Sequence, residues 1–184
     1  MNVAHIGGRN GAVAAFANGR LLVFGGLTAT NEVAPVEEYD PAANQWTQRG
    51  SMPQGLSPST AVVVGSVIYL NGIVGGAIAR FDAQQRVWLD QEIRLPDWSE
   101  RALLEDGGGG ILSFHSSTSY MGRPIYRYLP ATAEWSFRGL IPPRYPIGSV
   151  VALRLGTTAY LVSPNLSVLT LDLSSFQELR FKRE

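Results

Sequence analysis

The chain of 184 residues has no cysteine, two histidines and a single lysine, Lys182. Without cysteine, disulfides, thiolate zinc sites and thiol catalysis are excluded. Fifteen basic residues balance fifteen acidic ones, so the chain lacks the positive charge that binds nucleic acid or an anionic membrane surface. The sequence has no run of about eighteen apolar residues, as a membrane-spanning helix requires. The start lacks signal-peptide features. We therefore expect a soluble cytoplasmic protein. Fourteen of the fifteen basic residues are arginine, which is typical of proteins from GC-rich bacteria.

A spacing of seven residues between an aromatic residue and a tryptophan recurs along the chain. The copies are Tyr39–Trp46, Phe81–Trp88, Tyr128–Trp135 and a degenerate fourth, Leu171–Glu178. In the fourth copy we expect Leu179 or Phe181 to replace the tryptophan. Two apolar runs precede each copy, and in the first repeat they flank Asn18-Gly19, a strong hairpin signal. This pattern predicts about four strands in each repeat. No segment has the apolar periodicity of a helix, so no helix is predicted.

The first repeat resembles the kelch family. The resemblance rests on Gly25-Gly26 after an apolar strand, on Tyr39, and on Trp46 after the Asp40-Pro41 turn. Kelch repeats are blades of β-propellers, so the resemblance implies an all-β fold, a small β-propeller of four four-stranded blades. The blades are expected at residues 9–52, 57–95, 100–141 and 147–184 of a single domain. Stacking between neighbours would bury both faces of each blade.

The regular spacing of Trp46, Trp88 and Trp135 predicts a repeated packing role, with the three rings largely buried between sheets. Trp98 lies outside this spacing and is a candidate for an exposed contact. The glycine run Gly107–Gly110 leads into a strand rather than a helix, so we interpret it as a hairpin turn and not as a phosphate loop.

Evidence for catalysis in the sequence is sparse. His5 and His115 are the two histidines, which is a poor ligand set for a metal without cysteine, and the common hydrolase and nucleotide motifs are absent. We expect no metal and no cofactor. A resemblance to bacterial kelch-type sialic acid epimerases leaves a metal-free sugar-processing enzyme as the alternative, with His115 as its catalytic residue. The sequence therefore leaves enzymatic activity open and favours a non-enzymatic binding scaffold.

The expected binding site lies on the propeller face that bears the loops between second and third strands and the segments leading into the innermost strands. Its residues supply cationic, polar and aromatic contacts: Arg9, Asn31, Arg101, His115, Tyr120, Arg123, Arg144 and Tyr145. Guanidinium groups bind carboxylates in a bidentate manner. We therefore expect a protein, peptide or acidic glycan ligand, such as an acidic peptide or a carboxylate-bearing sugar. A closed monomer is preferred, and a dimer of two half-rings is the alternative.

Overall fold

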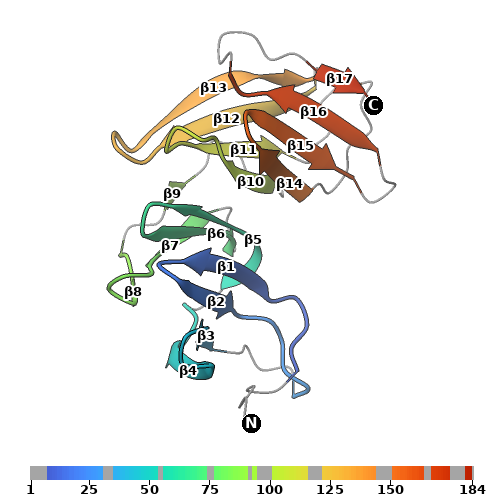
Figure 1. Ribbon diagram of the computed structural model, residues 1–184. Helices are drawn as coiled ribbons and strands as arrows, with labels where there is room; N and C mark the ends of the chain where they lie inside the picture. Colours follow the sequence, from blue (N-terminus) through green and yellow to red (C-terminus); the bar gives the residue numbers. More distant parts are fainter. Residues whose placement is uncertain are drawn as a thin grey trace. The chain divides into compact units, whose positions relative to one another are not determined.

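The computed structural model of the chain is an all-β structure (Figure 1). It describes residues 8–30, 35–53, 56–73, 77–90, 93–94, 101–115, 122–143, 151–163, 167–174 and 181–183. Within these ranges the chain forms strands and turns and no helix, so none of the described segments is a helix that could cross a membrane. The chain divides into two compact units, residues 1–96 and 97–184.

The first unit holds two antiparallel sheets. Sheet 1 has the order β1 (Val13–Ala17), β2 (Arg20–Phe24), β3 (Val36–Asp40), β4 (Gln45–Gly50). Sheet 2 has the order β5 (Leu56–Val64), β6 (Val67–Ile73), β7 (Ala77–Asp82), β8 (Val87–Trp88), and a fifth strand, β9 (Ile93–Arg94), also pairs with β7.

The second unit repeats this plan. Sheet 3 has the order β10 (Arg101–Glu105), β11 (Ile111–His115), β12 (Arg123–Leu129), β13 (Glu134–Ile141). Sheet 4 has the order β14 (Val151–Leu155), β15 (Thr158–Val162), β16 (Val168–Asp172), β17 (Phe181–Arg183). Four sheets in chain order confirm the expectation of four four-stranded repeats, with β9 as an addition.

Short turns join the first to the second strand of each sheet. Asn18 and Gly19 both have positive φ, 50° and 73°, as a two-residue hairpin turn between right-handed twisted strands requires. In sheet 3 the run Gly107–Gly110 joins β10 to β11, which confirms its interpretation as a hairpin turn. Asp106 Oδ1 accepts hydrogen bonds from the amides of Gly108 and Gly110 at 2.7 and 3.0 Å, which fixes the shape of this turn.

The turns between third and fourth strands share an aspartate. Asp40 Oδ1 accepts from the amides of Ala42 and Ala43, at 2.8 and 3.2 Å. Asp82 and Asp172 accept from amides two residues further on in the same way. Such side chains mimic a backbone turn, so three of the four repeats start this turn with the same device.

The repeated aromatic residues pair across neighbouring strands. Tyr39 lies opposite Trp46, Phe81 opposite Trp88 and Tyr128 opposite Trp135, and the ring centroids are 5.1 Å apart in each pair. In sheet 4 the partner of Leu171 is Phe181. Of the two residues expected to replace the fourth tryptophan, Phe181 therefore holds its place in the register.

The three tryptophans are half-buried, and Trp88 packs against the core between sheets 1 and 2, as expected from the sequence. Each stands on the fourth strand of its sheet, at the end of the strand order. Trp88 is the best anchored, because its ring contacts Phe24 and Phe81 and its Nε1 donates to the Ser51 carbonyl at 3.2 Å. Trp98 lies outside the described residues.

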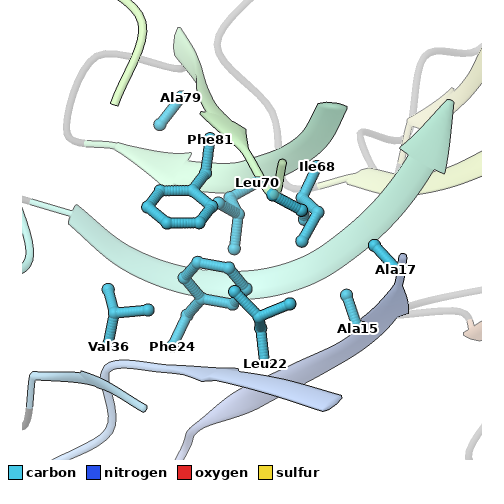
Figure 2. Close-up of a cluster of buried hydrophobic side chains, with 10 residues drawn as sticks. Ala15, Ala17, Leu22, Phe24, Val36, Ile68, Leu70, Ala79 and Phe81 are labelled. Carbon is cyan, nitrogen blue, oxygen red and sulfur yellow. The ribbon is translucent and has the colours of Figure 1, made fainter. Parts of the chain in front are cut away.

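Each unit has an apolar core between its two sheets. In the first unit Phe24 of sheet 1 meets Phe81 of sheet 2 in an edge-to-face contact with centroids 5.5 Å apart (Figure 2). In the second unit Leu112, Phe114 and Ile125 of sheet 3 pack with Leu161 and other residues of sheet 4. These cores lie on the alternating positions that strand pleating directs to one face.

Candidate ligand-binding site

Each sheet has two chemically different ends. The turn end carries the short turns after the first and third strands. The loop end carries the loop between the second and third strands and the segment that leads into the first strand. By their positions in the sequence, the eight residues predicted to bind a ligand fall in or next to these two kinds of segment.

The structure describes four of the eight predicted residues in some form. Arg9, His115 and Arg123 are described with their side chains, and Arg101 through its backbone. The other four lie outside the described residues, and for them ligand binding remains a prediction: Asn31, Tyr120, Arg144 and Tyr145.

Arg9 is nearly buried in the first unit, with 9% of its side chain exposed. Its guanidinium forms an ion pair with Glu37, itself 6% exposed. The same group donates from Nη1 to the carbonyls of Gly25 and Pro35, at 3.2 and 3.1 Å. Arg9 therefore ties the segment before β1 to β2 and β3, and both of its Nη groups already have partners within the sheet.

Register pairs near the turn ends allow equivalent positions of the four sheets to be compared. The aligned pairs are Leu21 with Tyr39, Ile68 with Phe81, Ile111 with Tyr128 and Ala159 with Leu171. Four residues beyond the first member of each pair lie Gly25, Gly72, His115 and Ser163. An imidazole in sheet 3 thus occupies a position that holds glycine or serine in the other three sheets.

Two neighbours of His115 also differ from the equivalent residues of the other sheets. Ser113 stands where the other sheets have Val23, Leu70 and Leu161. Tyr126, which pairs with Ser113 across the strands, stands where the others have Glu37, Ala79 and Leu169. We call Ser113, His115 and Tyr126 the polar cluster of sheet 3.

The polar cluster is held together by direct contacts. Ser113 Oγ lies 3.3 Å from His115 Nε2, and the His115 ring lies 5.2 Å from that of Tyr126 at a tilt of 57°. Ser113 and His115 are 0% and 1% exposed, whereas Tyr126 is half-buried. The cluster therefore leads from the sheet interior to the surface, beside the loop that follows His115.

Arg123 lies at the same end of sheet 3 but on its opposite face. It shares alternate positions of β12 with Ile125, which packs against sheet 4, whereas the polar cluster occupies the other face. Burial lowers the pKa of Arg123. The structure thus places His115 and Arg123 in one sheet without bringing their side chains to one face.

Gly122 fixes where β12 begins. Its φ is +119°, and a Cβ built there would lie 2.6 Å from the Ile141 carbonyl oxygen. A side chain would therefore both strain the backbone and displace β13. The loop after His115 is thereby held to a defined end point beside Arg123.

The turn ends carry ion pairs that link neighbouring sheets. Glu38 of β3, 2% exposed, accepts from Arg49 at 2.9 Å and from Arg86 of sheet 2 at 3.0 Å. Burial acts to raise the pKa of Glu38, but hydrogen bonds from Arg86 and Arg49 outweigh it and hold the pKa below its ordinary value. In the second unit Glu105 pairs with Arg154 of sheet 4 at 2.8 Å. These charges cross-link sheets and have protein partners.

The polar cluster offers hydroxyl and imidazole groups that can hold a polar loop or a ligand. Since His115 is 1% exposed, its ring cannot meet a substrate directly in this conformation. Among the described residues no group of three or more acidic or histidine side chains is arranged to hold a metal. Reasoning from the sequence missed Ser113, Tyr126 and Glu37. Aligning the four copies on their aromatic residue would have revealed all three.

Four antiparallel sheets of four or five strands, connected in order and packed face to face within each unit, define the blades of a β-propeller. The solved structure of YjhT, a kelch β-propeller, superposes with a TM-score of 0.72 over 96% of this chain and 65% of that one, at 14% identity. The Kelch motif family matches residues 8–53. The first repeat therefore matches a kelch motif, and the chain as a whole has the β-propeller fold.

Curated relatives match in sequence as well. N-acetylneuraminate epimerase of Pasteurella multocida (strain Pm70) is 26% identical over 163 residues, which is 82% of this chain and 39% of that protein. Kelch-like protein terF of Aspergillus terreus (strain NIH 2624 / FGSC A1156) is 30% identical over 99 residues, 49% of this chain and 22% of that protein. The chain thus spans well under half the length of either relative.

Proposed function

We propose that this chain is a kelch-type binding domain, not itself an enzyme, that recognises a carboxylate-bearing sugar at the loop end of sheet 3. The observation that carries the proposal is the polar cluster, whose three positions hold apolar or small residues in the other sheets, with the exception of Glu37 in sheet 1. A repeat departs from its own pattern where a local function outweighs packing. The cluster therefore serves to anchor the loop that follows His115.

The loop itself has the chemistry of a sugar-binding segment. Residues 116–121 read Ser-Ser-Thr-Ser-Tyr-Met, which supplies hydroxyl groups and one aromatic ring. The predicted guanidinium groups of Arg101 and Arg144 would pair with the carboxylate. The relative that covers 82% of this chain acts on N-acetylneuraminate, an acidic sugar, which supports the choice of ligand class.

Burial of His115 favours binding over catalysis. A general acid or base must come within hydrogen-bond reach of its substrate, and an imidazole with 1% exposure is placed to support a loop instead. The second candidate, a sugar epimerase, is favoured by the similarity to N-acetylneuraminate epimerase alone.

The proposal is tested by isothermal titration calorimetry of the full chain with N-acetylneuraminate and with its methyl ester, which removes the charge. We expect the acid to bind and the ester to bind at least tenfold more weakly. Tyr120→Ala and Arg144→Ala should each weaken binding of the acid. The matched control is Arg20→Ala at the turn end of sheet 1, which should bind like the wild type.

Two results would overturn this assignment. If the acid and the ester bind equally, the carboxylate is not recognised. If a catalytic amount of the chain accelerates a change in configuration of N-acetylneuraminate, followed by proton NMR, the epimerase candidate replaces the binding domain.

A further inference from the structure

One arginine closes the loop end of sheet 1. The Arg9 guanidinium forms an ion pair with Glu37 of β3 and donates to the carbonyls of Gly25 and Pro35, at 3.2 and 3.1 Å. Gly25 and Pro35 are the first and last residues of the loop between β2 and β3. We call these four residues the clasp of sheet 1. The clasp ties the segment before β1 to both ends of this loop.

Register identifies the same four positions in sheet 3. Phe16 of sheet 1 is equivalent to Glu105 of sheet 3, because their strand partners are the first members of the aligned pairs. Seven residues before Phe16 is Arg9, and seven residues before Glu105 is Trp98. The clasp positions of sheet 3 therefore hold Trp98, His115, Pro124 and Tyr126. Trp98 lies outside the described residues, so its place is inferred from this register.

The positions of the clasp ion pair change together from sheet to sheet. Sheet 1 has opposite charges there, sheet 3 has two aromatic residues and sheet 4 has two aliphatic ones. The pairs are Arg9 with Glu37, Trp98 with Tyr126, and Ile147 with Leu169. An irregular register at the start of β5 interrupts the count in sheet 2. Matched changes are expected of side chains in contact, since a buried charge needs a partner of opposite charge and an apolar group does not.

The described residues of sheet 3 offer a surface on which an indole ring can pack. The Tyr126 ring is half-buried, and its centroid lies 5.2 Å from that of His115 and 5.8 Å from that of Phe137. Aromatic rings attract one another in edge and offset contacts at such distances. The indole N–H is also a hydrogen-bond donor, so Trp98 can make one of the two bonds to loop carbonyls that Arg9 makes in sheet 1.

We propose that Trp98 packs on Tyr126 and closes the loop end of sheet 3, as Arg9 closes that of sheet 1. The segment that it fixes leads into Arg101, which pairs with His115 across the strands. The inference rests on the proposed function, in which Arg101 binds the carboxylate of the sugar. Trp98 is then a positioning residue that acts on the ligand through Arg101, in place of the exposed contact expected from its spacing.

The ring contact is tested first, without a ligand. Nuclear Overhauser effects in the full chain should connect the indole protons of Trp98 with the ring protons of Tyr126. The pair of sheet 1 is then transferred to sheet 3, and stability is measured by urea denaturation. Trp98→Arg and Tyr126→Glu should each destabilise the chain, and the double variant should recover at least about tenfold in the folding equilibrium constant over additivity. Trp98→Arg with Tyr126→Gln is the matched control and should not recover.

The positioning role is tested by calorimetry with N-acetylneuraminate and its methyl ester. Trp98→Ala should weaken binding of the acid at least about fivefold and leave binding of the ester unchanged, because only the acid pairs with Arg101. Trp98→Phe keeps a ring on Tyr126 and should retain most of the affinity. Trp46→Ala, at the turn end of sheet 1, is the matched control and should leave the affinities for both ligands unchanged.

The outcomes separate the contact, the positioning role and the proposed function. A wild-type chain without Overhauser effects between the two rings overturns the inference, and so does equal recovery with Glu and with Gln at position 126. Equal weakening of acid and ester by Trp98→Ala shows a purely structural role and overturns the positioning of Arg101. If neither ligand binds the wild type, the proposed function and the positioning role both fail, while the ring contact is decided by the measurements without ligand.

Discussion

The turn ends and the loop ends of the sheets are built in contrasting ways. Turn ends repeat one design, with an aspartate that accepts from turn amides and carboxylates that pair with arginines of the neighbouring sheet. Loop ends differ from sheet to sheet: sheet 1 buries the Arg9–Glu37 pair and sheet 3 the polar cluster. The contrast indicates that the turn ends hold the fold together while the loop ends are free to acquire function.

The largest effect is expected at the turn end of sheet 3. The Asp106 carboxylate is 0% exposed and accepts from Arg127 Nε at 2.5 Å and from two amides. Asp106→Ala removes these three hydrogen bonds to a charged acceptor and should cost about 3 kcal/mol of unfolding free energy, measured by urea denaturation. The partly exposed Asp40→Ala should lose only about 1 kcal/mol. Equal losses at both sites would contradict the assignment of Asp106 as the structural centre of its turn.

A smaller loss is expected where the loop end depends on backbone geometry. Gly122→Ala forces a side chain into a positive φ and against the Ile141 carbonyl, and should cost about 1–3 kcal/mol. Gly8→Ala is the control, since a Cβ there meets nothing within 4 Å. Thermal melts in which both variants match the wild type would show that β12 can shift its start.

The buried carboxylates of the turn ends predict an acid dependence of stability. Burial acts to raise the pKa of Asp106, but hydrogen bonds from Arg127, Gly108 and Gly110 outweigh it and lower the pKa. A lowered folded-state pKa contributes stability that is fully present above the unfolded value of about 3.9 and lost as pH falls through the folded value. Unfolding free energy should therefore decline below about pH 5.

Asp106→Asn separates this group from the other carboxylates. The variant should be less stable than wild type at pH 7, with a smaller decline on acidification, measured by urea denaturation at a series of pH values. Parallel curves for the two proteins would show that Asp106 does not titrate differently in the folded chain.

The smallest effect on stability is expected within the polar cluster. His115→Ser introduces the residue that sheet 4 has at the equivalent position, Ser163. We expect a loss of about 1 kcal/mol, because Tyr126 loses its ring contact, together with at least tenfold weaker sugar binding. A variant with wild-type affinity would contradict the anchoring role of His115.

Much of the fold was predictable because it repeats. The spacing between Tyr39 and Trp46 recurs in the next two copies, and the structure pairs each aromatic residue with its tryptophan across the strands. The spacing defines a register, and it does not show that each tryptophan stands on the outermost strand of its sheet. Phe181 stands ten residues after Leu171 and not seven, so the fixed spacing alone does not select it over Leu179.

The site was less predictable, because its residues meet through strand pairing and not through sequence distance. Arg9 is a residue type that often contacts ligands, but its guanidinium forms an ion pair with Glu37, which is 28 residues further on. His115 and Arg123 flank one loop, yet pleating directs them to opposite faces. Ser113 and Tyr126 look ordinary in a strand and become informative once they are compared with the equivalent positions of the other sheets.

The most direct test of the division between turn ends and loop ends is an amide NMR titration of the full chain with N-acetylneuraminate. The account predicts that the perturbed amides gather at the loop end of sheet 3, in residues 113–126. The amides of Gly107–Gly110, at the opposite end of the same sheet, should stay unchanged. Perturbations centred on Gly107–Gly110, or none at a saturating concentration of the sugar, would contradict the account.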